Sequence, residues 1–296
     1  MSDELVITPQ KVAVIGIGRM GWHMAAHLAR VGHDVTVCDA APGVAERWAA
    51  EHRGVAAADA ASAVVGCSII VTSLPADPQL RDVADAIVPL IGAGVVWVDH
   101  STTSAEGSRV VAAEVAATGA HFLDAPVSGG VDGARNGTLT VMVGGDDDAF
   151  ATAEPVIAAY GARIVLMGPS GAGQITKMTN QICVVGLCQA LAEGLDFAET
   201  AGLDVRRVIH VMLQGSSASW QMANRAERML DGEYDYGFST TLMRKDIGLV
   251  LDEADSMNVP LPVTSMVGQM LAEVTAMGGA GWDWCSLMER QRRRRS

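Results

Sequence analysis

Short apolar runs rich in β-branched residues recur through the first 168 residues of the chain. Several of them run at their carboxyl ends into Ser, Thr, Pro or Gly, and segments with helical spacing separate them. This pattern is typical of strands buried on both faces of a parallel sheet, with ligand-binding loops along one edge. The predicted strands are Lys11–Ile15, Asp34–Cys38, Cys67–Pro75, Gly94–Thr103, Ala120–Gly130, Thr138–Gly145 and Ala162–Gly168.

Two segments between these strands show the helical pattern most clearly. Ser104–Thr118 has the spacing and position of a right-handed crossover between parallel strands. Asp146–Gly161 begins with three acids, which we interpret as stabilising the amino end of a helix through its dipole rather than as metal ligands. Strands alternating with helices predict an α/β domain.

Helical periodicity replaces the strand pattern beyond Gly168 and continues to the end of the chain. The longest apolar helix opens after a glycine-rich bend at Gly171, and further helical segments follow at Ser216–Leu230, Gly237–Pro262 and Thr264–Trp284. We therefore expect an α/β domain over 1–169 and an all-α domain over 170–296, joined by the long helix.

Composition narrows the class of partner. The chain has 296 residues, long enough for two ordinary domains, and its formal net charge is −13. Nucleic-acid surfaces need clustered Lys and Arg, so we expect no nucleic-acid partner. The one basic run, Arg290 to Ser296, is expected to be a solvated terminus, with binding of an anionic partner as the alternative.

The amino-terminal residues and the length of the apolar runs predict the cellular compartment. The amino-terminal MSDELVITPQ contains two acids and no apolar core, so we expect no signal or transit peptide. No charge-free apolar run reaches about 18 residues, so we expect no membrane span and a cytoplasmic protein.

An odd number of cysteines without a C-x-x-C pair indicates neither a disulfide framework nor a metal site, and we interpret all five as small buried hydrophobes: Cys38, Cys67, Cys183, Cys188 and Cys285.

The first strand ends in G-x-G-x-x-G and a helical stretch follows at once. In that context the motif is a dinucleotide-binding fingerprint of the Rossmann type. Gly16 makes the turn, Gly18 admits the pyrophosphate, and Gly21 lets helix and strand pack closely. Asp39 ends the second strand about 20 residues later, where a carboxylate binds the ribose hydroxyls and repels a 2′-phosphate. No arginine follows directly, so NAD is predicted rather than NADP.

A lysine stands one turn inside the long apolar helix. Helical spacing places Lys177, Asn180 and Gln181 on neighbouring faces, so an ammonium and one or two carboxamides can project to one spot. Burial lowers the pKa of a lysine because desolvation disfavours its charged form. The alternative is a lysine whose stem covers apolar surface while its amine reaches water. The helix alone does not decide between them.

Four separated blocks of the chain together resemble one family. They are IGIGRMG at the end of the first strand, DAPVSGG at Asp124–Gly130, GAGQITKMTNQ at Gly171–Gln181 and KDIGLVLDEA at Lys245–Ala254. In this order they resemble the 3-hydroxyisobutyrate dehydrogenase group of the β-hydroxyacid dehydrogenases, relatives of 6-phosphogluconate dehydrogenase, over essentially the whole chain. The resemblance implies a doubly wound, mostly parallel Rossmann-type sheet followed by an all-α domain joined by a long helix.

The resemblance also implies residue roles. Lys177 matches the catalytic lysine, and Ser128, Gly129 and Gly130 match a loop that holds the substrate carboxylate. The family's carboxamide falls four residues after the lysine as Asn; this chain has Asn180 at three and Gln181 at four, and both stay candidates. The cofactor-binding residues expected from the fingerprint and the resemblance together are Gly16, Ile17, Gly18, Arg19, Met20, Gly21, Asp39, Leu74, Pro75, Gln79, Thr102 and Lys245.

The implied activity is hydride transfer between NAD and the hydroxyl-bearing carbon of a short 3-hydroxy acid. The substrate would be 3-hydroxyisobutyrate, a serine-like acid, or glycerate interconverting with tartronate semialdehyde, with Lys177 as general acid and base. His100 is a second candidate acid or base, which we interpret as a loop residue instead. A related imine or carbonyl reductase should lack the lysine, and a non-catalytic nucleotide-sensing module should lack Lys177 or the SGG loop. Glycine and alanine in the long helix favour close helix contacts and a homodimer or homotetramer.

Overall fold

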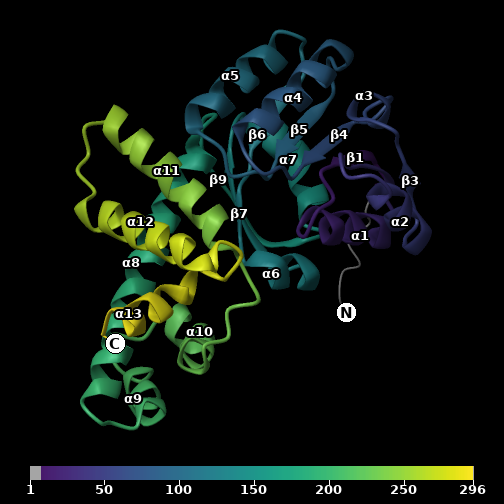
Figure 1. The fold of residues 1–296 in the computed structure, drawn as a ribbon. Helices are drawn as coiled ribbons and strands as arrows, with labels where there is room; N and C mark the ends of the chain where they lie inside the picture. The colour runs from purple at the N-terminus through teal and green to yellow at the C-terminus, as the bar shows by residue number, and fades with distance from the viewer. Residues whose placement is uncertain (1–7, 296) are drawn as a thin grey trace. The chain divides into compact units, whose positions relative to one another are not determined.

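The computed structural model describes residues 8–295 (Figure 1). The chain divides into two compact units, Met1–Lys177 and Met178–Ser296, here called unit 1 and unit 2. Residues 1–7, on which the prediction about a leader peptide depends, lie outside the described residues.

Unit 1 contains a nine-stranded sheet, counted over the described residues, with the order β3-β2-β1-β4-β5-β6-β8-β7 and β9 paired to β8. All pairs from β3 to β6 are parallel, whereas β8 runs antiparallel to β6 and β7. The strands are β1 Lys11–Ile15, β2 Asp34–Cys38, β3 Val55–Ala56, β4 Ile69–Thr72, β5 Val96–Asp99, β6 His121–Asp124, β7 Val127–Ser128, β8 Leu139–Gly144 and β9 Gly161–Gly168.

Helices cover both faces of this sheet, because alternate residues of each buried strand point to opposite faces. Val12 and Val14 of β1 pack in one core with α1, α2, α6 and α7, and Ala13 and Ile15 pack in a second core with α3, α4 and α5 (Figure 1). The helices are α1 Gly21–Val31, α2 Val44–Glu51, α3 Ala60–Ala63, α4 Asp77–Ile87, α5 Ala105–Ala116, α6 Gly130–Asn136 and α7 Asp147–Ile157, with a 3₁₀ turn at Val88–Leu90.

The predicted doubly wound, mostly parallel sheet is therefore confirmed. β1 and β2 occupy the predicted residues, and Asp146 caps α7 by accepting the amides of Asp148 and Ala149. The apolar pattern did not predict the two-residue strand β3, that the predicted strand Ala120–Gly130 divides into β6 and β7, or that β8 turns antiparallel. Strands of two residues are too short to show a period, and strand direction depends on pairing partners elsewhere in the chain.

Unit 2 is helical, and its core gathers Val185, Leu195, Met229, Leu271 and Trp284 with their neighbours. Its elements are α8 Ala172–Thr200, which begins in unit 1, α9 Val205–Met212, α10 Trp220–Asp231, α11 Thr240–Ser256, α12 Pro262–Val274, a π-helical turn Thr275–Gly279, a 3₁₀ turn Trp284–Ser286 and α13 Leu287–Arg295.

By length and composition alone α8 could cross a membrane, a test that buried core helices of soluble proteins also pass. Half of its most apolar window is buried inside the structure. Within this helix the cysteine prediction is half wrong: Cys188 is fully buried, but Cys183 lies on an exposed face. The two residues are five apart, which places them about 140° apart around the helix axis, so they lie on different faces.

A buried ion pair anchors the segment that precedes α13. Arg225 of α10 binds Asp283, whose carboxylate also accepts the amides of Phe238 and Cys285. The guanidinium lies over the Trp284 ring, 5.1 Å from its centroid. Because every oxygen of Asp283 is satisfied, the pair ties α10 to the start of the carboxyl-terminal segment without leaving a buried charge alone.

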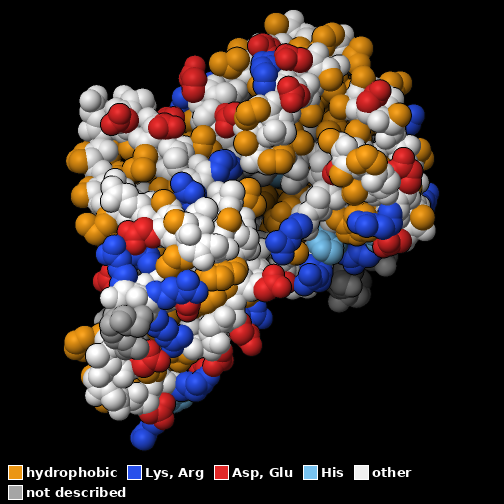
Figure 2. Space-filling model, viewed as in Figure 1, with side chains coloured by type: hydrophobic (Ala, Val, Ile, Leu, Met, Phe, Trp, Pro, Cys, Tyr) orange, Lys and Arg blue, Asp and Glu red, His pale blue; other side chains and the backbone are white. Residues whose placement is uncertain are grey.

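The expectation of a solvated carboxyl-terminal run is wrong for Arg290 and Arg292 of α13, whereas Arg293 and Arg294 are exposed as expected. Arg292 binds Glu199 of α8 at 3.0 Å and donates to the carbonyl of Leu230 at the end of α10. Arg290 is 5% exposed and binds Glu273 of α12 at 2.9 Å. Figure 2 shows basic and acidic side chains mixed over this part of the chain. Acids of α8 and α12 thus pair with part of the basic run.

The two arginines that share Glu273 provide a matched test of this docking. The side chain of Arg290 is 6% exposed and that of Arg294 is 65% exposed. Arg290→Met should lower the free energy of unfolding by about 1–3 kcal/mol, because it removes a buried hydrogen bond to a charged group. Arg294→Met should change it by less than about 0.5 kcal/mol, as exposed ion pairs do. Urea unfolding of both variants measures the difference, and equal small losses would show that α13 is not docked in solution.

Candidate active site

The glycine turn after β1 has the geometry that a dinucleotide requires. Gly16 has φ +84°, and a Cβ there would lie 2.4 Å from the Ser73 carbonyl oxygen; a Cβ on Gly21 would lie 2.1 Å from the Gly16 carbonyl oxygen. A Cβ on Gly18 would meet nothing within 4 Å. The first turn of α1 contains no acid, and its N-cap Met20 makes no side-chain cap. The amides at this helix start are therefore free of a protein anion, which fits a bound pyrophosphate.

Asp39 at the end of β2 lies against the same turn. Its carboxylate accepts the Ile17 amide at 2.9 Å and the Ala41 amide at 2.8 Å. Each carboxylate oxygen can accept further hydrogen bonds, so these contacts orient the group and leave acceptor capacity for ribose hydroxyls. The sequence predicted the carboxylate at this position but not that it also holds the glycine turn.

The loops after β4 and β5 are joined by a buried aspartate. Asp99 accepts the Ser101 hydroxyl at 2.5 Å and the Thr72 hydroxyl at 2.6 Å. The Ser101 oxygen in turn accepts the Leu74 amide at 2.8 Å. Since β1 and β4 are neighbours where the strand order reverses, Leu74 lies beside the glycine turn, the usual place for a ligand in such sheets.

The other residues predicted to bind cofactor lie around these loops and differ in exposure. Arg19, Pro75 and Gln79 are exposed, and Met20 and Thr102 are half-buried. Exposure leaves them accessible to a ligand, and their binding role stays a prediction.

His100 is buried, and both of its ring nitrogens are in use. One nitrogen contacts the Ala125 carbonyl at 2.6 Å and must donate to it; the other lies 2.7 Å from the Tyr160 hydroxyl, which then donates. Burial lowers the pKa of His100 to about 4, so the ring is neutral near pH 7. A histidine with both nitrogens engaged inside the core is a packing residue here.

The SGG loop connects β7 to α6. Ser128 is half-buried, and Gly129 and Gly130 are exposed with φ +124° and +63°. Two successive positive φ values favour glycine, because other residues rarely adopt them. The loop therefore presents backbone amides and one hydroxyl at an accessible turn, a donor set that suits a carboxylate.

Lys177 lies beside this loop. The residue is 9% exposed, and its Nζ donates to the Val127 carbonyl at 2.9 Å, one residue before Ser128. The low exposure favours a buried amine over the alternative of a lysine that reaches bulk water. The structure brings together two motifs that are about 50 residues apart in the chain.

The remaining predicted residues belong to unit 2. Gln181 accepts from the Asn180 amide at 2.9 Å and donates to Asp246 of α11 at 2.7 Å. Lys245 forms an ion pair with Asp246 at 2.9 Å. Both ends of the Gln181 carboxamide are thus engaged within unit 2, whereas half-buried Asn180 is the more accessible amide. The roles of Asn180, Gln181 and Lys245 toward ligands stay predictions.

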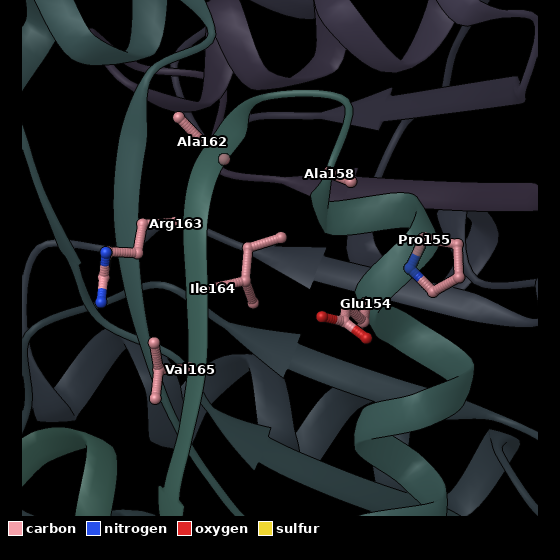
Figure 3. Close-up of a pocket in the computed structure, with 8 residues that line it drawn as sticks. Glu154, Pro155, Ala158, Ala162, Arg163, Ile164 and Val165 are labelled. Carbon is pink, nitrogen blue, oxygen red and sulfur yellow. The ribbon is translucent and has the colours of Figure 1, made fainter. Parts of the chain in front are cut away.

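Measurable hollows elsewhere in unit 1 contain none of the predicted site residues. One of about 580 Å³ lies between the end of α7 and the start of β9. Figure 3 shows Glu154 and Ile164 facing each other across it, with Arg163 pointing away. This hollow is open and has no convergent polar groups, so it does not compete with the loop edge as the candidate site.

Family models match nearly the whole chain. Residues 11–168 match the NAD-binding domain of 6-phosphogluconate dehydrogenase, and residues 171–290 match the model described as NAD-binding of NADP-dependent 3-hydroxyisobutyrate dehydrogenase. The two matches meet at the start of α8.

Three individual proteins are similar over almost their full lengths. An uncharacterized oxidoreductase of Shewanella frigidimarina is 48% identical over 97% of this chain and 99% of its own. The 2-hydroxy-3-oxopropionate reductase of Escherichia coli is 35% identical over 94% and 96%. The structure of Mycobacterium tuberculosis 3-hydroxyisobutyrate dehydrogenase with L-serine has a TM-score of 0.90 and 31% identity, covering 96% of this chain and 100% of that one.

The buried Asp99 predicts a pH dependence of stability. Burial raises its pKa from the ordinary 3.8 to about 6. Between about pH 4 and pH 6 the folded protein holds a proton there that the unfolded chain has released, so this contribution to stability falls as pH rises. The free energy of unfolding of the wild type relative to Asp99→Asn should fall by up to about 3 kcal/mol across that range.

Urea unfolding of both proteins at several pH values measures this difference. Asn keeps the shape and carries no titrating proton, so the comparison isolates Asp99 from the other acids. A difference that is flat between pH 4 and pH 7 would contradict the raised pKa.

Proposed function

The chain belongs to the 3-hydroxyisobutyrate dehydrogenase group of the β-hydroxyacid dehydrogenases, and on that premise we propose that it is an NAD-dependent dehydrogenase of a short 3-hydroxy acid. The observation that carries the proposal is the contact of the Lys177 amine with Val127, beside the SGG loop. A proton-transfer group and a carboxylate-binding loop then lie together, next to loops that fit a dinucleotide.

The substrate class follows from these groups. A carboxylate on the SGG loop would place the neighbouring carbons of a short acid near Lys177. The related reductase acts on 2-hydroxy-3-oxopropionate by its name, and the similar solved structure holds L-serine. We therefore favour 3-hydroxyisobutyrate, a serine-like acid, or glycerate with tartronate semialdehyde.

In this proposal the chain's residues handle the proton and the orientation. A bound nicotinamide would be the hydride acceptor. As the hydroxyl-bearing carbon gives up its hydride, the uncharged Lys177 amine accepts the hydroxyl proton, and in reduction the ammonium returns it. Ser128 and the backbone amides of Gly129 and Gly130 hold the carboxylate, and Asn180 is the amide that we assign to the substrate. The presence of Lys177 argues against an imine reductase or a non-catalytic module.

We also infer NAD as the preferred cofactor, because Asp39 carries the negative charge where NADP has its 2′-phosphate. The exposed apolar residues Leu187 and Phe197 on α8 favour a homodimer or homotetramer. The cytoplasm remains the expected compartment.

Lys177→Ala tests the function directly. The wild type should reduce NAD with at least one acid from a panel of 2- and 3-hydroxy acids, followed by NADH absorbance. The variant should lose at least about 100-fold in kcat on the best substrate while its Kd for NADH changes little, since positioned acid–base groups contribute about 10² to 10⁴. Lys177→Arg should fail as well, because guanidinium stays protonated.

Val110→Ala, at an exposed position of α5, is the control and should retain wild-type kcat. A Lys177→Ala variant with near wild-type turnover would refute the role of the lysine. A wild type inactive toward every acid in the panel would refute the substrate class.

The cofactor preference depends on one carboxylate and can be reversed. The double change Asp39→Ser and Ala40→Arg should raise kcat/KM for NADP and lower it for NAD, because a like charge is removed and ribose hydrogen bonds are lost. The gain should weaken at high salt, since an exposed Arg–phosphate pair is screened. A wild type that uses NADP as well as NAD would overturn the assignment.

A further inference from the structure

Two fully buried polar side chains of unit 1, Asp124 and Gln174, have no direct role in the chemistry proposed above. Neither side chain is accessible to a substrate. Asp124 opens the DAPVSGG block and Gln174 lies in the first turn of α8, three residues before Lys177. We call the pair the α8 bracket.

Asp124 holds the start of α8 from the sheet. Its Oδ1 accepts the Gly171 amide at 2.7 Å and its Oδ2 accepts the Gln174 amide at 3.0 Å. A carboxylate at a helix start satisfies amides that the helix itself leaves unpaired and interacts favourably with the helix dipole. The position of the first turn of α8 in unit 1 therefore depends on where β6 ends.

The first turn of α8 packs directly against the backbone of the sheet, with no room for a side chain between them. A Cβ on Gly173 would lie 2.3 Å from the Asp124 carbonyl oxygen and 2.5 Å from that of Met142. A Cβ on Gly144 would lie 2.6 Å from Asp124 Oδ1. Helix and sheet backbones thus touch, and any side chain at either position would push the first turn of α8 away.

Gln174 holds the same turn to the loop after β5. Its Nε2 donates to the Ser101 carbonyl at 2.9 Å and to the Thr103 hydroxyl at 3.1 Å, and its Oε1 accepts the Thr103 amide at 3.2 Å. These contacts flank Thr102, a predicted cofactor residue. One glutamine therefore links the helix that carries Lys177 to the predicted cofactor loop.

Lys177, one turn further along α8, contacts the same segment as Gln174 does through Asp124. The segment that begins at Asp124 contacts α8 twice, through the Asp124 carboxylate at the Gln174 amide and through the Val127 carbonyl at Lys177 Nζ. We propose that Asp124 and Gln174 are positioning residues, which hold Lys177 at a set distance from the SGG loop and from the loop after β5. This proposal rests on the proposed function, and misplacement by about 1 Å can cost about 100-fold in rate.

Gln174→Met is the sharpest variant, because methionine keeps the length and removes all three hydrogen bonds. We expect kcat, expressed per NADH-binding site, to fall about 10- to 100-fold, with KM and the Kd for NADH within about threefold. The pH profile of kcat/KM should also change, because Lys177 would no longer be held against Val127. Asp124→Asn should behave in the same way.

Matched controls separate positioning from loss of stability. Gln189→Met replaces another buried glutamine of α8, whose side-chain amide donates to Glu193 at 2.7 Å. Asp146→Asn removes another carboxylate that caps a helix, α7. Both should leave kcat per site and the pH profile within twofold of the wild type, whatever their effect on Tm. Unchanged kcat per site and an unchanged pH profile in Gln174→Met would overturn the proposal.

Two further measurements cover failure of folding or of the substrate assignment. If Gln174→Met does not fold, Thr103→Ala removes one partner of the glutamine and should lower kcat per site about 3- to 10-fold; no change would refute the bracket. If the wild type turns over no hydroxy acid, the proposed function fails on its own. The bracket is then judged by hydrogen exchange, where Gln174→Met should expose the Thr103 amide and Asp124→Asn the Gly171 amide. Wild-type exchange rates would overturn it.

Discussion

The direct contact between the first turn of α8 and the backbone of the sheet is the constraint on which the candidate site depends. Glycine at positions 144 and 173 allows the two backbones to approach closely enough for a buried carboxylate to reach the amides of the helix. From that fixed start, one turn of helix brings Lys177 over Val127. Close packing of this kind leaves the first turn of α8 no room to shift. The position of Lys177 therefore depends on the edge of the sheet as much as on its own helix.

The amino ends of α1, α7 and α8 carry free amides that favour a negative charge, but the three helices differ in what supplies that charge. α7 is capped by Asp146 and α8 receives Asp124, so their free amides already face a protein carboxylate. α1 has no acid in its first turn and no side-chain cap, and Gly18 leaves open space before it. Because such amides favour negative charge, the missing protein anion marks α1 as the helix that fits a ligand's phosphates.

Local signals predicted much of the candidate site. The glycines at 16, 18 and 21 were predicted from their spacing after a strand, and the structure provides the turn and the close contacts that the spacing requires. The predicted ends of β4, β5 and β6 carry the loops at one edge because parallel strands point the same way. The same reasoning missed Asp99, Asp124 and Gln174. Each is a common polar residue next to a strand or inside a helix, and nothing in its local pattern shows that it is buried.

The sequence by itself determined most of the longer strands, the change from an α/β unit to a helical one, and the residue types at the dinucleotide turn. These depend on periodicity and backbone preference, which act over a few residues. Only the tertiary structure decided that β8 runs antiparallel, that Arg290 and Arg292 of α13 are docked on Glu273 and Glu199, and that Lys177 meets Val127. These contacts join residues 17 to 93 positions apart. Which residues pair in such contacts depends on how whole helices and strands pack together, and a local sequence pattern contains no information about that packing.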